Sequence, residues 1–70
     1  MTIVVKIIEI IGVSDKSWED AAMNGIQEAS KTVKNITGVD VVNFTAKVED
    51  GKITQYKATC KIAFTVTRKE

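Results

Sequence analysis

The sequence predicts an α+β fold in which a three-stranded antiparallel sheet packs on one helix, in the element order β-α-β-β. Three observations predict it. Residues 2–11 are rich in β-branched side chains and form too short a run for a helix of this composition. Residues 17–35 carry apolar side chains at spacings of three and four. Residues 39–68 alternate between apolar and polar around an Asp-Gly pair, as a long hairpin does. The 70 residues suffice for one domain, which we expect to span positions 1–70.

The first strand is expected over Thr2–Ile11, and both of its faces are apolar. One parity carries Ile3, Val5, Ile7 and Ile11, and the other carries Val4, Ile8 and Ile10. A strand that is buried on one face only does not need both sets. Either this strand is central in the sheet, or something outside the chain covers its second face.

The helix is expected to begin at Ser17, where Ser17 and Asp20 resemble a capping box. Ser14 is a second candidate for the cap. The helix should end near Asn35, with Gly38 at the exit. Its apolar stripe is thin and rich in alanine, so the helix can approach a sheet closely; the stripe consists of Trp18, Ala21, Ala22, Gly25, Ile26, Ala29, Val33 and Ile36.

The turn of the hairpin can be inferred from the parity of its two arms. The apolar residues are even-numbered in both arms, and directly opposed residues lie on the same face. This favours a three-residue loop, Glu49-Asp50-Gly51, which pairs Phe44 with Tyr56 and Val42 with Ala58. A two-residue Asp50-Gly51 turn with a bulge elsewhere is the alternative.

The predicted topology leaves the first strand at an edge. A crossover helix makes strands one and two parallel, so the third strand fits between them in the order 1-3-2, with the helix on the even-numbered face. An edge strand that is apolar on both faces is an aggregation hazard, which predicts a closed homo-oligomer. The odd face of the hairpin suits a subunit interface or a shallow ligand surface, or is ordinary solvated sheet; it carries Val39, Val41, Asn43, Gln55, Lys57, Thr59, Lys61 and Ala63.

Composition argues against several function classes. The formal net charge is +1, without a basic block, so we expect no nucleic-acid partner. No apolar run approaches the ~20 residues that cross a bilayer, and no signal peptide is recognisable, so we expect no membrane partner and a cytoplasmic location.

There is no histidine, and Cys60 lies among apolar residues as a core side chain does. Trp18 is interpreted as an anchor for the helix and Glu49-Asp50 as solvated turn residues. We therefore predict that the protein is not an enzyme.

Three segments together resemble the dodecins, which are small β-α-β-β proteins. They are IIGVS at Ile10–Ser14, SWEDAA at Ser17–Ala22 and KIAFTV at Lys61–Val66. The resemblance covers essentially the whole chain. It implies a hollow homododecamer that binds or stores a small ligand without turning it over, most often a flavin such as riboflavin or FMN.

In the flavin-binding members, a tryptophan at the start of strand two stacks on the isoalloxazine ring and a glutamine in strand three hydrogen-bonds its polar edge. These positions fall at Gly38 and Lys57 here, with Gln55 two residues away on the same face. Gly38, Gln55 and Lys57 are therefore the candidate cofactor-binding residues. Glycine supplies none of the ~1–3 kcal/mol that one stacked aromatic ring contributes.

A subset of the family offers an alternative. Its members carry a basic residue at the position of Lys57, the SWE of the helix start and a GKIT after the turn, here Gly51–Thr54. Members of this kind are described as calcium-binding dodecins, and no motif assigns their metal ligands to residues of this chain. The resemblance thus implies either a flavin-sequestering protein or a flavin-free dodecin that binds calcium or serves as a structural shell.

Overall fold

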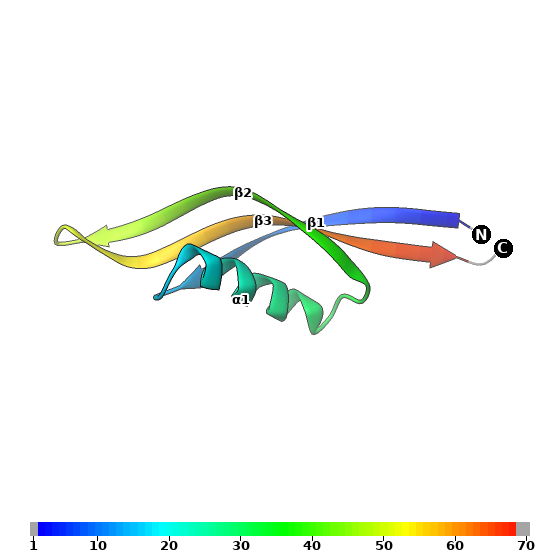
Figure 1. The fold of residues 1–70 in the computed structure, drawn as a ribbon, viewed down its shortest axis with the longest axis horizontal. Helices are drawn as coiled ribbons and strands as arrows, with labels where there is room; N and C mark the ends of the chain where they lie inside the picture. The colour runs from blue at the N-terminus through cyan, green and yellow to red at the C-terminus, as the bar shows by residue number, and fades with distance from the viewer. Residues whose placement is uncertain (1, 69–70) are drawn as a thin grey trace.

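The computed structural model describes residues 2–68 and shows the predicted element order (Figure 1). The elements are β1 (Thr2–Ser14), α1 (Trp18–Ser30), β2 (Ile36–Glu49) and β3 (Lys52–Arg68). β3 pairs antiparallel with both other strands, so the sheet order is β1-β3-β2, as predicted. α1 lies on one side of the sheet, mainly over β1 and β3. It is too short to cross a membrane.

β1 is three residues longer than predicted, because the strand does not stop at Ile11. Gly12, Val13 and Ser14 pair with Ala58, Lys57 and Tyr56 of β3. The helix crosses β1 at Gly12, where a Cβ would overlap the carbonyl oxygen of Ala21 and lie 3.1 Å from the backbone nitrogen of Gly25. The glycine therefore sets how closely α1 packs on the sheet.

The start of α1 confirms the predicted cap, and its end corrects the prediction. The Ser17 hydroxyl accepts a hydrogen bond from the Asp20 backbone N–H at 2.9 Å. The helix ends at Ser30 and not near Asn35. Asn35, with φ of 65°, adopts the left-handed conformation at the exit that was expected around Gly38. The helix was predicted to be too long because Ile36, which begins β2, continues the apolar spacing of the helix.

The hairpin turn has two residues, so the three-residue loop was the wrong choice and its alternative is right. Asp50 and Gly51 have φ of 52° and 74°, as a type I′ turn requires. Glu49 pairs with Lys52, and the register then shifts between Lys47 and Val48. This bulge restores even-with-even pairing, but it sets Phe44 opposite Ala58 and Ala46 opposite Tyr56.

Two further register shifts lie in β2, and the one between Val41 and Asn43 moves two valines to the other face. They occur between Val41 and Asn43 and between Ile36 and Gly38. Val41 consequently pairs with Cys60, and Val39 pairs with Ile62, on the side that α1 covers. The prediction that Val39 and Val41 lie on the odd face was therefore wrong.

The buried core is small and lies between α1 and β3. Its members are Ala21, Ala29, Ala58, Cys60 and Ile62. The chain is elongated, with extents of 58 × 19 × 13 Å and a radius of gyration of 14.7 Å, where a compact domain of this length has about 11 Å. Much apolar surface consequently stays exposed on both sides of the sheet.

Candidate functional site

The candidate residues lie on the side of the sheet opposite α1, which we call the helix-free face. On β3 this face carries Gln55, Lys57, Thr59, Lys61 and Ala63, between the buried residues of the other parity. On β1 it carries an apolar row with side chains that are 41 to 64% exposed: Ile3, Val5, Ile7, Ile11 and Val13. The face therefore combines an apolar edge with a polar centre.

Lys57 and Gln55 lie close together at the hairpin end of this face. Lys57 stands between Val13 on β1 and Thr45 on β2, and Gln55 stands opposite Lys47. Two residues along a strand span about 7 Å, and their side chains point to the same side. An amide and an ammonium group thus face the same space and can donate hydrogen bonds to one ligand.

Gly38 lies at the other end of the face and is not brought near Lys57 within one chain. It pairs with Ala63, six residues from Lys57 along β3, which corresponds to about 20 Å. Apart from its neighbours in the chain, no heavy atom of the described residues lies within 4 Å of where a Cβ would stand at Gly38, and its φ is not positive. A large side chain would fit there, so the glycine leaves an open surface without being required by the backbone.

A row of charges crosses the helix-free face and was not identified from the sequence. Lys61 pairs with Glu9 on β1 and with Asp40 on β2, so a cation lies between two carboxylates. The register of both strand pairs was needed to find it, because the three residues are far apart in the sequence. Within residues 2–68, no group of three or more Asp, Glu, His or Cys side chains is arranged to hold a metal ion.

Trp18 lies on the opposite side and anchors the start of α1 to the hairpin. Its indole Nε1 donates to the backbone oxygen of Thr45 at 2.8 Å. The ring meets Tyr56 and Phe44 edge-on, at centroid distances of 4.8 and 6.1 Å. Its contacts hold the helix against β2 and β3, as predicted.

A polar network closes the loop between β1 and α1. The buried Ser14 hydroxyl donates to Asp20 Oδ2 at 2.6 Å and accepts from the Lys16 backbone N–H at 2.9 Å. The Asn24 amide donates to the backbone oxygen of Val13 at 3.0 Å. Ser14 therefore fixes the loop, while Ser17 caps the helix.

Cys60 is fully buried beneath α1, which confirms its place in the core. Desolvation by burial raises the pKa of its thiol above the ordinary value. Because the thiolate is the reactive form, this cysteine is an inert packing residue at neutral pH.

Comparisons with known proteins match the chain over nearly its whole length. The family model for dodecin matches residues 4–67. Calcium dodecin of Mycobacterium tuberculosis is 39% identical over 62 residues, which cover 87% of this chain and 86% of that protein.

Two solved structures show the same architecture. The crystal structure of the calcium-chelating calcium dodecin from M. tuberculosis is 34% identical, with a TM-score of 0.79 over 96% of both chains. Dodecin from Streptomyces davaonensis is 28% identical, with a TM-score of 0.90 over 97% of this chain and 100% of that one. The backbone is thus shared with both, and the sequence identity is higher to the calcium protein.

Proposed function

The chain belongs to the dodecin family, and from that premise we propose that it is a non-enzymatic, oligomeric binding protein whose small ligand is calcium and not a flavin. The observation that carries this proposal is Gly38. It leaves open space on the helix-free face at the position where the family resemblance implies a tryptophan. Without that ring, a flavin loses about 1–3 kcal/mol of stacking, which corresponds to roughly a 5- to 150-fold weaker affinity.

The proposed oligomer is a closed shell of twelve chains, as the resemblance implies. It is supported by the exposed apolar row on β1, whose Val5 and Ile7 side chains are 57 and 61% exposed in one chain. β1 is also a sheet edge, with a row of backbone groups that β3 does not pair. A second copy that covers this strand would bury the exposed apolar row and shield the unpaired backbone groups of the edge.

Calcium is supported by the relative, and the helix-free face adds two carboxylates as candidate ligands, with the Lys61 ammonium between them. The M. tuberculosis protein is a calcium dodecin, and it shares 39% of residues over 62 positions with this chain. Calcium prefers several oxygen ligands, which carboxylates and backbone carbonyls supply. Glu9 and Asp40 are exposed carboxylates on this face, so they are the first positions to test as ligands.

A flavin is the second candidate, and the pair Gln55 and Lys57 favours it. Both residues lie on the helix-free face, so they could donate hydrogen bonds to the polar edge of an isoalloxazine ring or to a phosphate. Gly38 belongs to the same proposed site only if another copy brings it near, because about 20 Å separates it from Lys57 along one strand.

The two ligands are separated by titrating the purified oligomer with each. With calcium we expect heat in calorimetry and a higher melting temperature, because a ligand that binds only the folded state stabilises it. Magnesium at the same concentration serves as the control for ionic strength. With riboflavin we expect unquenched fluorescence. Quenched riboflavin fluorescence, together with calcium titrations that show neither heat nor a higher melting temperature, would overturn the proposal. If neither ligand gave a signal, the protein would be left with a purely structural role as a shell.

A further inference from the structure

We propose that, in the assembled protein, β2 of one copy packs its helix-side apolar residues into a groove between α1 and β1 of the next copy. This inference rests on the proposed oligomer and specifies one of its contacts. The occupant of the groove is thus a second copy of this chain. Each helix would then cover two strands of its own sheet and one strand of its neighbour's.

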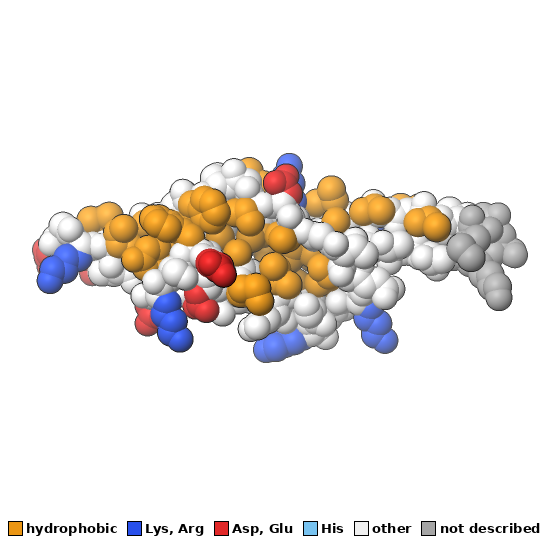
Figure 2. Space-filling view, in the orientation of Figure 1, with side chains coloured by type: hydrophobic (Ala, Val, Ile, Leu, Met, Phe, Trp, Pro, Cys, Tyr) orange, Lys and Arg blue, Asp and Glu red, His pale blue; other side chains and the backbone are white. Residues whose placement is uncertain are grey.

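The first half of the contact is the β2 apolar surface, which we define as Val39, Phe44 and Val48. These side chains are 42, 56 and 59% exposed. They stay largely exposed to solvent because α1 lies over β1 and β3 and makes few contacts with β2. Figure 2 shows hydrophobic side chains gathered on this side of the molecule, along the hairpin and beside the helix. Within the described chain, the Trp18 ring meets Phe44 edge-on, and Phe44 nevertheless stays 56% exposed.

The second half is the α1–β1 groove, which has a volume of about 310 Å³. Its apolar lining consists of Ile8, Ile10 and Ile11 from β1 with Gly25 and Ala29 from α1. Glu28 and Thr32 stand at its rim. Gly25 keeps the groove open, because a Cβ there would lie 2.8 Å from Cδ1 of Ile10.

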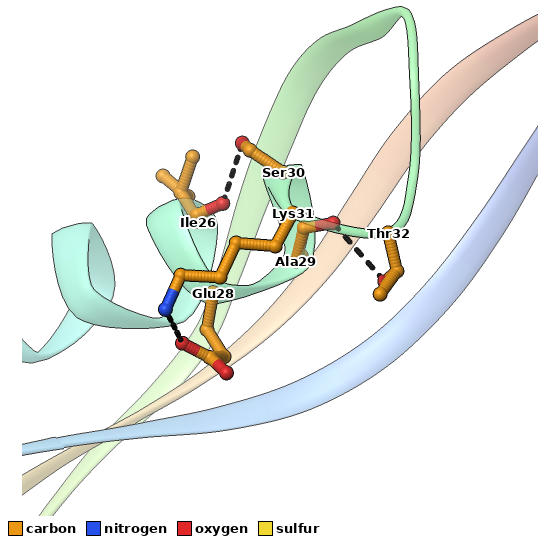
Figure 3. Close-up of polar contacts among 6 residues, drawn as sticks. All are labelled: Ile26, Glu28, Ala29, Ser30, Lys31 and Thr32. Carbon is orange, nitrogen blue, oxygen red and sulfur yellow. Dashed lines mark hydrogen bonds and ion pairs between the residues drawn. The ribbon is translucent and has the colours of Figure 1, made fainter.

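The polar groups around the end of α1 already have partners within the chain (Figure 3). The Glu28 carboxylate pairs with the Lys31 ammonium at 2.9 Å. The Thr32 hydroxyl reaches the backbone oxygen of Ala29 at 3.5 Å, and the Ser30 hydroxyl donates to that of Ile26 at 2.7 Å. What the groove offers a partner is therefore mainly its apolar wall, which suits apolar side chains such as those of β2.

The positions of the two surfaces favour contact between different copies. β1 and β2 are the two edges of the sheet, so the groove and the β2 apolar surface lie at opposite edges of the helix-bearing side. One chain cannot bring them together. A contact between two different surfaces is heterologous, and it repeats head to tail until the rotation closes a ring. A closed shell can be built from such rings.

The exposed area fits an interface of this kind. The chain exposes 5197 Å², whereas a compact monomer of 7.7 kDa exposes about 4300 Å². The excess of roughly 900 Å² is spread over the whole elongated chain, and it is of the size that one partner contributes to a stable interface, ~800 Å². A partner of the same sequence is present wherever the chain is present, which makes a second copy the natural occupant.

The test uses one variant on each half of the contact, with native mass spectrometry as the readout. Phe44→Asp places a charge on the β2 apolar surface, and Thr32→Arg blocks the rim of the groove from an exposed position. Phe44→Tyr and Gln27→Arg are the matched controls, because Gln27 is an exposed residue of the same helix that does not line the groove. Circular dichroism verifies that each variant is folded. If Phe44→Asp is unfolded, the assembly size of Thr32→Arg alone tests the inference.

We expect each disrupting variant alone to stop at species smaller than the wild-type assembly, while both controls reach full size. Mixing the two variants should produce a species that contains both masses, because the Thr32→Arg copy still carries Phe44 and the Phe44→Asp copy still has an open groove. Full-size assembly of both variants, or no mixed species, would overturn the inference. A monomeric wild type would instead overturn the proposed oligomer itself.

Discussion

The contact between α1 and β1 makes Gly12 a sharp test of how the helix is seated. In Gly12→Ala, the new methyl group would overlap the carbonyl oxygen of Ala21 and lie 2.9 Å from its carbonyl carbon. These are backbone atoms, so they cannot swing aside as the end of a flexible side chain would. The helix must move away from the strand, and the packing of the small core loosens with it.

The magnitude follows from two opposing effects. Overpacking of this kind costs about 1–3 kcal/mol, and replacing glycine by alanine returns about 0.4–1 kcal/mol through the unfolded state. The expected net loss is about 1–2 kcal/mol, which corresponds to roughly 4–16 °C in melting temperature for a domain of this size.

The assay is urea unfolding at one fixed protein concentration, because assembly contributes to stability. Gly38→Ala is the matched control, since in the part of the chain that the structure describes only its own chain neighbours come within 4 Å of where its Cβ would be placed. We expect Gly38→Ala to unfold at the same or a higher urea concentration than the wild type. Equal urea midpoints for Gly12→Ala and Gly38→Ala would show that α1 does not need a glycine at position 12 to pack on β1.

Three further predictions concern assembly, ligand choice and the buried thiol. Val5→Asp puts a charge into the exposed apolar row of β1, so we expect the variant to lose the full assembly in size-exclusion chromatography. An unchanged elution volume would contradict the proposed oligomer. Gly38→Trp combined with Lys57→Gln should quench riboflavin fluorescence, which the wild type does not do, because the surface at Gly38 is open. A fluorescence titration measures this quenching. If the double variant does not quench riboflavin either, these positions do not form the flavin site. Burial raises the pKa of Cys60, so the folded thiol stays protonated while the unfolded one ionises above about pH 8.5. The free energy of unfolding should therefore be insensitive to this thiol below that pH and fall as the pH rises above it, and urea titrations should show that Cys60→Ala removes this component.

The parts of the fold that depend on local pattern were predictable. The Ser17 cap and the burial of Cys60 follow from residue type and alternation, and the central position of β3 follows from the crossover connection through the helix. The register of the hairpin was not predictable in the same way. Alternation within each arm does not reveal an unpaired residue between two well-patterned stretches, and each of the three register shifts in β2–β3 adds one. Val39 changed faces for this reason.

The candidate site was predictable only as a set of positions. Family resemblance pointed to Gly38 and Lys57, and the structure places them about 20 Å apart on the same face of one chain. The row formed by Glu9, Lys61 and Asp40 became visible only when both strand registers were known. A site that several copies build together depends on their relative placement, which local sequence pattern does not encode.

We propose above that this dodecin is an oligomer that binds calcium and not a flavin. Native mass spectrometry of the undenatured protein, with calcium and riboflavin offered together, is the decisive measurement because it reports subunit number and bound ligand at once. We expect the mass of twelve chains with added calcium and no added riboflavin. A folded monomer, or a twelve-chain assembly that carries riboflavin and no calcium, would contradict it.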